Sequence, residues 1–301
     1  MPYRVSDQVV KTNYTDRINA QRTRLNVLQE RITTGKRINR PSDDPSGAAA
    51  VIKLRTSQTE IDQFKRSAAF ANQRLAGADT AINNYQSILE RVRTLTTQGL
   101  SGTASQEAKN ALATEIDALR GRILNLANSK YNDEYLFGGS RQNAPPFDPT
   151  TATPAAAPAT AQRIQIEPGA SALAVGVTAE TVFSDATATI FEDLTAATAA
   201  LRGTGDPAAD RATLENTMSR LATYRDLTAQ AHAQVGASMN ITELALARLG
   251  EDSLSYEGRI NAIEGDDFAA TAVELAETQS ALEAALKVAA STGKKSLFDY
   301  I

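Results

Sequence analysis

The sequence contains no cysteine and no tryptophan, and aromatic residues make up only 5% of its 301 positions. Without cysteine, the chain can form neither a disulfide framework nor a thiolate metal site. The scarcity of aromatic residues, beside 42% apolar residues in all, favours long helices with narrow apolar seams over a thick globular core. The net charge of −4 does not indicate a nucleic-acid-binding surface.

The sequence also lacks the features of a membrane-spanning segment and of a cleaved secretory signal. No run approaches ~18 consecutive apolar residues, so we expect no membrane-spanning segment. The first 19 residues lack a charged region followed by an apolar stretch, so we expect no cleaved secretory signal. If the protein leaves the cell, we expect it to use another route.

Apolar residues recur at alternating steps of three and four, which is the spacing of coiled-coil helices. The longest stretch predicts a helix over about 46–98, with the seam Leu54, Ser57, Ile61, Phe64, Ala68, Ala71, Leu75, Ala78, Ile82, Tyr85, Leu89 and Val92. The N-terminal seam includes Tyr14, Ile18, Leu25, Leu28 and Ile32, and the C-terminal seam comprises Phe268, Ala272, Leu275, Gln279, Leu282, Leu286 and Ala289. Because a lone amphipathic helix leaves its stripe exposed, we expect the terminal helices to pack against each other and then against other subunits.

The middle of the chain has a different character. Residues 138–160 are rich in Gly, Pro, Ala and Thr, and the alternating apolar residues that follow, up to Val177, predict short strands. The predicted fold is therefore mainly α: a long antiparallel helical coiled-coil bundle formed by the N- and C-terminal regions, with a small β-rich inserted domain. We divide it into terminal coiled-coil segments (1–40 and 265–301), a helical rod domain (41–137 and 189–264) and a small outer insert (138–188).

The stretch from 33 to 51, TTGKRINRPSDDPSGAAAV, carries the densest set of charged residues. Asp43 and Asp44 could be catalytic carboxylates or metal ligands, but a hard metal ion needs several converging oxygens. Capping explains the pattern better: Gly35 as the C-cap of one helix, Asp44 as the N-cap of the next, and Pro45 at its first position. We predict helix caps here.

The basic residues Lys36, Arg37 and Arg40 could grip phosphate or RNA, but no aromatic residue is interleaved with them. A partner surface fits better, with carboxylates of a neighbouring subunit such as Glu264, Asp266 or Asp267. The single histidine, His232, lies in a helical stretch without a nucleophile motif. We therefore predict no catalytic, cofactor-binding or metal-binding residues, no cofactor and no enzyme activity.

Residues 31–49, RITTGKRINRPSDDPSGAA, resemble the N-terminal signature of the bacterial flagellin superfamily, and the NRPSDDP form resembles the hook-associated proteins of the hook–filament junction. Residues 233–244 and 275–301, which close with SLFDYI, resemble the C-terminal region of the same family. Residues 138–188 match nothing specific.

The resemblance implies a structural flagellar subunit that is exported unfolded by a type III apparatus, without a cleaved signal, and forms the junction layer outside the cell. It implies that the terminal helices are disordered in the monomer and become ordered on assembly. The implied partners are other copies of the chain, a hook-associated protein on the hook side, flagellin on the filament side and a cytoplasmic export chaperone, with no nucleic acid or membrane. A filament-forming flagellin and a cytoplasmic coiled-coil scaffold remain as alternatives.

The candidate subunit-interface residues come from the terminal segments. Five come from the N-terminal seam, three are leucines of the C-terminal seam, two are the first basic residues after Gly35, and two are aromatic residues near the C-terminus. They are Tyr14, Ile18, Leu25, Leu28, Ile32, Lys36, Arg37, Leu275, Leu282, Leu286, Phe298 and Tyr300.

Overall fold

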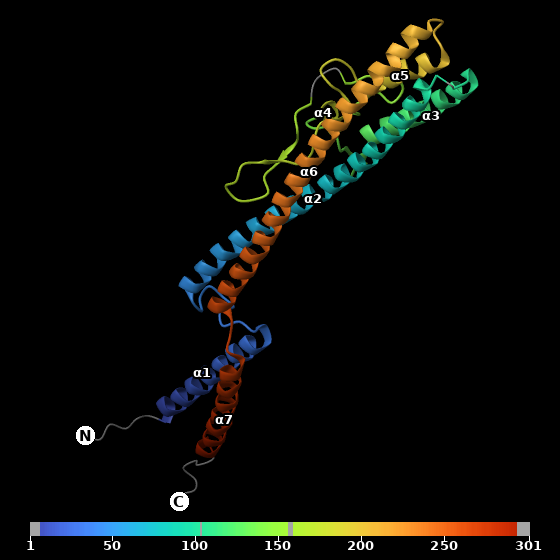
Figure 1. The fold of residues 1–301 in the computed structure, drawn as a ribbon. Helices are drawn as coiled ribbons and strands as arrows, with labels where there is room; N and C mark the ends of the chain where they lie inside the picture. The colour runs from blue at the N-terminus through green and yellow to red at the C-terminus, as the bar shows by residue number, and fades with distance from the viewer. Residues whose placement is uncertain (1–6, 103, 156–158, 294–301) are drawn as a thin grey trace, which may run out of the picture. The chain divides into compact units, whose positions relative to one another are not determined.

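A computed structural model of the protein describes residues 7–102, 104–155 and 159–293. Most of these residues are helical (Figure 1). The helices are α1 (Asp7–Thr34), α2 (Pro45–Leu100), α3 (Gln106–Ala127), α4 (Ala179–Phe183), α5 (Ile190–Arg202), α6 (Pro207–Glu264) and α7 (Phe268–Gly293). The predicted mainly-α fold with a small β region is confirmed.

Contacts divide the chain into two compact units, which we call unit 1 (residues 1–60 and 252–301) and unit 2 (residues 61–251). Helices α2 and α6 contribute residues to both units. In unit 1, α1 packs along α7 (Figure 1), and Val51, Leu54 and Ile260 form a small core of their own. The boundaries of the predicted terminal, rod and insert domains stay a prediction.

The core of unit 2 is built on the predicted seam of α2. Of the seam residues from Ile61 to Val92, all are buried except Phe64, which is half-buried. Buried residues of α3, α5 and α6, including Ile116, Leu194 and Leu221, complete one continuous cluster. The heptad spacing thus located the buried face of α2, because a helix this long buries its stripe against partners along much of its length.

The β region is smaller than the alternating pattern predicts. The strands β1 (Lys130–Tyr131) and β2 (Glu134–Tyr135) form one antiparallel pair, and β3 (Arg163–Ile164) and β4 (Leu173–Ala174) form another. Ile166, Val175 and Val177 are buried although they lie beyond the strands, so their alternation reflects burial of loop side chains in unit 2.

Aromatic side chains attach this loop region to the helices. Phe183 lies between Tyr85, at 4.6 Å between ring centroids, and Phe137, at 5.4 Å. Phe147 meets the ring of Phe191 at 4.8 Å. Five of the chain's 16 aromatic residues thus pack together here, in tilted and edge-to-face contacts. Among the helices that the structure describes, none is long and apolar enough to cross a membrane.

Candidate functional site in the terminal helices and their loops

The contact between α1 and α7 fully buries few apolar side chains. On α1, the seam residues Tyr14, Ile18, Leu25 and Ile32 are half-buried, and Leu28, at 2% exposed, is the one fully buried apolar side chain of the described part of this helix. Arg24 adds an ion pair with Glu274 of α7. A two-helix pair with so little burial is marginal by itself, because few apolar contacts offset the ordering of the chain.

The seam of α7 differs from the predicted one. Thr271 and Thr278 are buried, while Leu275 and Leu282 are half-buried. The predicted seam residues Phe268, Gln279 and Leu286 are instead exposed, so that part of the seam prediction was wrong. The helix has apolar residues around most of its circumference, so spacing alone did not decide which stripe faces α1. The exposure of Leu286 leaves it accessible to a neighbour.

The loop from α1 to α2 pairs with the loop from α6 to α7 through two backbone hydrogen bonds, which we call the loop bridge. The Arg37 amide donates to the Glu264 carbonyl at 2.7 Å, and the Asp266 amide donates to the Gly35 carbonyl at 3.1 Å. Gly35 directly follows α1, has φ +66°, and donates its amide to the Arg31 carbonyl at 2.8 Å. This left-handed C-terminal turn is the geometry that glycine allows most easily.

The carboxylate of Glu264 is the polar centre of the loop bridge. Its side chain is 8% exposed and accepts from Lys36 Nζ at 3.0 Å and from an Arg55 guanidinium nitrogen at 2.6 Å. Burial raises the pKa of Glu264, but the hydrogen bonds from Lys36 and Arg55 outweigh burial and the net shift is downward. The carboxylate therefore stays ionised and ties three chain segments together.

Arg37 places its positive charge at the C-terminal end of α6, whose last turn has no basic residue of its own. Its guanidinium donates to the Ile263 carbonyl at 2.9 Å and lies 3.4 Å from an Asp44 carboxylate oxygen. A cation at this end satisfies free carbonyl groups and complements the helix dipole. Lys36 and Arg37 thus find partners within their own chain, and their contact with a neighbouring subunit stays a prediction.

The two adjacent aspartates have separate structural partners. Asp44 precedes α2 and accepts the Gly47 amide at 2.9 Å, with Pro45 as the first residue of the helix. Asp43 accepts the amides of Asn39 and Arg40, at 3.1 and 2.8 Å. The pKa of each carboxyl is lowered, mainly by the Arg40 amide for Asp43 and by the Gly47 amide for Asp44. Both carboxylates act on the backbone of the loop, as N-cap and turn residues do.

Arg40, the third basic residue of this stretch, lies 3.2 Å from a carboxylate oxygen of Glu30 in α1. Phe298 and Tyr300, which were predicted as subunit-interface residues, lie outside the residues that the structure describes. Within the described ranges there is no group of three or more His, Asp or Glu side chains placed to hold a metal ion.

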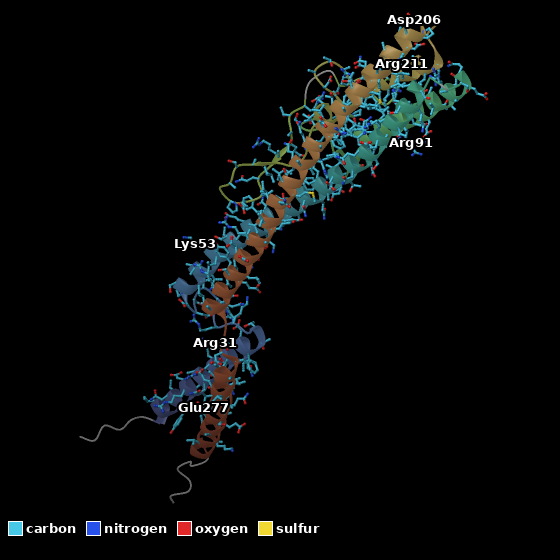
Figure 2. All side chains as sticks on the ribbon, in the orientation of Figure 1. Arg31, Lys53, Arg91, Asp206, Arg211 and Glu277 are labelled. Carbon is cyan, nitrogen blue, oxygen red and sulfur yellow. The ribbon has the colours of Figure 1, made fainter. Side chains whose placement is uncertain are left out.

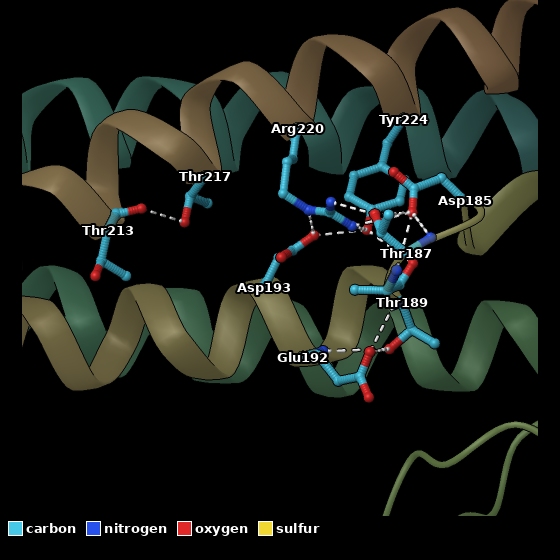
Figure 3. Close-up of polar contacts among 10 residues, drawn as sticks. Asp185, Thr187, Thr189, Glu192, Asp193, Thr213, Thr217, Arg220 and Tyr224 are labelled. Carbon is cyan, nitrogen blue, oxygen red and sulfur yellow. Dashed lines mark hydrogen bonds and ion pairs between the residues drawn. The ribbon is translucent and has the colours of Figure 1, made fainter.

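Sequence reasoning missed a polar network in unit 2 whose charged members are half-buried (Figure 3). Arg220 of α6 lies 2.5 Å from Asp193 of α5 and 3.1 Å from Asp185. The Tyr224 hydroxyl donates to Asp193 at 2.6 Å, and Thr187 accepts from Arg220 at 2.7 Å. The network fastens the α4–α5 loop and α5 to α6.

The pKa shifts in this network agree with a structural role. Burial raises the pKa of Asp185, but hydrogen bonds from the Ala188 and Thr187 amides and from Arg220 outweigh it, and the net pKa lies far below the usual range. Burial and the hydrogen bond to Asp193 raise the pKa of Tyr224. No local motif announces such a network, because its members come from separate elements that only the fold brings together.

Two further long-range contacts in unit 2 were not anticipated. Arg74 of α2 is buried, lies 3.1 Å from Glu134 and donates to the Tyr135 carbonyl at 2.8 Å, which fastens the β1–β2 pair to α2. His232 of α6 lies with Nε2 at 2.8 Å from Asp79 of α2. Both contacts join separate elements within unit 2.

Comparison with known proteins finds similarity to flagellar proteins. Residues 5–142 match the family model of the bacterial flagellin N-terminal helical region. Flagellar hook-associated protein 3 of Escherichia coli is 27% identical over 297 residues, which cover 89% of this chain and 90% of that protein. The same-named protein of Salmonella typhimurium is 29% identical over 149 residues, 49% of this chain and 47% of that protein.

The fold agrees with these matches. The flagellar junction protein FlgL from Legionella pneumophila has a TM-score of 0.58 at 14% identity, covering 72% of this chain and 100% of that one. Flagellin of Listeria innocua is 27% identical over 142 residues, but that match covers only 47% of this chain. Similarity along nearly the whole chain is thus found with hook-associated protein 3. The chain is thus similar to flagellar hook-associated protein 3 along most of its length, and its N-terminal part is similar to the bacterial flagellin N-terminal helical region.

Proposed function

We propose that this protein is a structural subunit of the bacterial flagellum that forms the junction layer between hook and filament, and that it assembles with copies of itself through unit 1. The observation that carries the mechanism is the distribution of exposed apolar side chains. Of the ten exposed large apolar residues in the described ranges, eight lie in unit 1, although it is the smaller unit. Such a concentration marks an interaction surface.

The proposed mechanism couples folding to association. The α1–α7 pair buries one leucine and two threonines fully along its seam, so the free energy it gains in the monomer is small. Neighbouring copies add apolar contact on the exposed faces, and this burial offsets the entropy of ordering the terminal segments. The interface residues predicted from the sequence, including Leu25, Leu282 and Leu286, lie on these two helices.

The proposed partners follow from the position of a junction. Besides its own copies, the protein would contact a hook-associated protein on one side and flagellin on the other, and an export chaperone would bind it in the cytoplasm. We place it outside the cell, exported without a cleaved signal. No nucleic acid, membrane, cofactor or catalytic activity belongs to the proposal. In support, two relatives carry the name flagellar hook-associated protein 3.

Filament-forming flagellin is the first alternative, because residues 5–142 match the bacterial flagellin N-terminal helical region. Electron microscopy of the purified protein in precipitating salt separates the two, because long self-propagating filaments would favour flagellin. A cytoplasmic coiled-coil scaffold is the second alternative, and recovery of the chain in sheared flagella would exclude it.

Deletion followed by electron microscopy tests the function itself. We expect cells lacking the protein to carry intact hooks without filaments and to release flagellin monomer into the medium. Normal filaments in the deletion strain would contradict the proposal.

A further inference from the structure

One end of unit 2 carries a pocket of about 360 Å³, which we call the end pocket. Its described residues come from the last turns of α2 and α5, the first turns of α3 and α6, and the two connections between them (Figure 1). Ala200 and Leu214, at 6% and 4% exposed, give it an apolar lining, and Gly102 and Gly205 line it from the exposed turns. Its volume lies at the small end of the range for binding pockets, ~300–1,000 Å³.

The walls of the end pocket are held by hydrogen bonds within the chain. The side-chain amide of Gln106 donates to the carbonyls of Leu201 and Arg202, at 2.9 and 3.1 Å, and so ties the start of α3 to the end of α5. Asp210 of α6 accepts the Thr204 hydroxyl at 2.6 Å and the Thr204 amide at 3.0 Å. Because these contacts fix both turns, little ordering is needed before another molecule can bind.

The charged side chains of the end pocket differ in whether they have a partner. Asp210 is engaged by Thr204, and Arg211, which lies at this end of unit 2 (Figure 2), pairs with Glu215 at 2.9 Å. The third, Lys109 of α3, is half-buried, and within the described ranges its ammonium has no ion-pair or hydrogen-bond partner. The pocket therefore holds one cation that no carboxylate of the described chain neutralises.

Two further acidic residues stand near the pocket in the sequence, and both are turned elsewhere. Asp206 precedes α6 and accepts the amides of Ala208 and Ala209, at 3.0 and 3.2 Å. Glu107 lies two residues before Lys109 on α3, and side chains two residues apart on a helix point to nearly opposite sides. An apolar lining beside an unpaired ammonium is complementary to a carboxylate that carries an apolar neighbour.

We propose that the end pocket receives a glutamate or aspartate carboxylate, together with the apolar side chain next to it, from an acidic segment of a different protein. A single partly exposed ion pair contributes little by itself, so the pocket suits one anchor of a larger contact better than a free small carboxylate. The densest acidic stretch of this chain, residues 264–267, is held in the loop bridge. The inference goes beyond the proposed function, which places assembly in unit 1, and does not rest on it.

A double-mutant cycle, measured by NMR on the purified full-length chain, tests the pocket. The probes are the peptides acetyl-Glu-Leu-amide and acetyl-Gln-Leu-amide, and the readout is the saturable shift of the Gly102 and Gly205 backbone amide signals. We expect binding in the millimolar range, with the Glu peptide bound about two- to fivefold more tightly than the Gln peptide. Lys109→Gln should abolish this preference, and Lys109→Arg should retain it.

Lys65 supplies the matched control, because it is another half-buried lysine of unit 2 without a partner in the described ranges. Lys65→Gln should leave the preference for the Glu peptide unchanged, and a loss as large as in Lys109→Gln would overturn the proposal. So would the absence of a saturable shift, or equal binding of the two peptides by the wild type.

Two other occupants of the end pocket are separated by the same measurement. Free isovalerate bound as tightly as the Glu peptide would indicate a small-molecule site, and shifts of the same two amides when the chain alone is concentrated would indicate a second copy. Either result would overturn the proposal. Each of these results concerns purified protein in solution, so the end pocket and the proposed place in the flagellum can fail separately.

Discussion

Replacing Glu264 by glutamine removes the charge at the centre of the loop bridge and keeps the side chain's shape. Breaking a fully buried ion pair costs ~3–5 kcal/mol, whereas an exposed pair contributes ~0.2–1 kcal/mol. Glu264 is 8% exposed, but its partners Lys36 and Arg55 are 41% and 50% exposed and can turn toward water. We therefore expect Glu264→Gln to destabilise the bridge by about 1–2 kcal/mol.

Amide hydrogen exchange of the full-length chain measures this locally. The amides of Arg37 and Asp266 close the loop bridge, so their exchange should become about tenfold faster, since ~1.4 kcal/mol corresponds to a factor of ten. The matched control is Glu215→Gln, which removes the carboxylate of the exposed pair Arg211–Glu215 on α6 and should leave both amides unchanged. Equal exchange at the two amides in wild type and Glu264→Gln would refute the reasoning.

Three further predictions concern the Arg220 network, the C-terminal turn of α1 and the loop bridge. Arg220→Met leaves Asp185 and Asp193 without their cation and should lower the stability of unit 2 by about 2–4 kcal/mol, seen as a thermal midpoint on the order of 6–12 °C lower; an unchanged midpoint would contradict the assigned role. Gly35→Ala meets open space but keeps φ +66°, so the α1 C-terminal turn should lose about 1 kcal/mol, measured by exchange of its own amide, and equal exchange would argue against the cap. Because the folded-state pKa of Glu264 lies below its ordinary 4.5, its contribution is present above pH 4.5 and is lost as the pH falls through the lower folded value; the bridge amides should exchange faster there in wild type, beyond the intrinsic pH effect, and not in Glu264→Gln.

The long helices could be predicted from the sequence because each keeps an apolar stripe buried over many turns. In α2, the residues from Ala68 to Leu75 that the heptad marks are buried in unit 2. The β region could not be predicted in detail, because Val175 and Val177 alternate as strand residues do and yet are buried in a loop. Alternation reports which side chains are buried, and it does not report whether the backbone is paired.

In the terminal helix α7, the spacing of apolar residues did not predict correctly which side chains face inward. On α7, leucine and phenylalanine suggested the seam, but Thr271 and Thr278 face inward and Phe268 is exposed. The hydroxyl of Thr278 donates back to the Glu274 carbonyl within the helix, so a threonine can occupy a buried position there with its hydroxyl satisfied. The carboxylate Glu264 was named as a partner for Lys36, but in a neighbouring subunit, since sequence alone does not show that the two loops of one chain meet.

Gold labelling of intact flagella tests the central claim most directly. An antibody against residues 138–188, the predicted outer insert, would be applied to cells expressing the full-length chain and viewed by electron microscopy. We expect label at a single position between the hook and the filament. Label along the length of the filament, or label absent from flagella while the chain is found in the cytoplasm, would contradict the assignment to the junction.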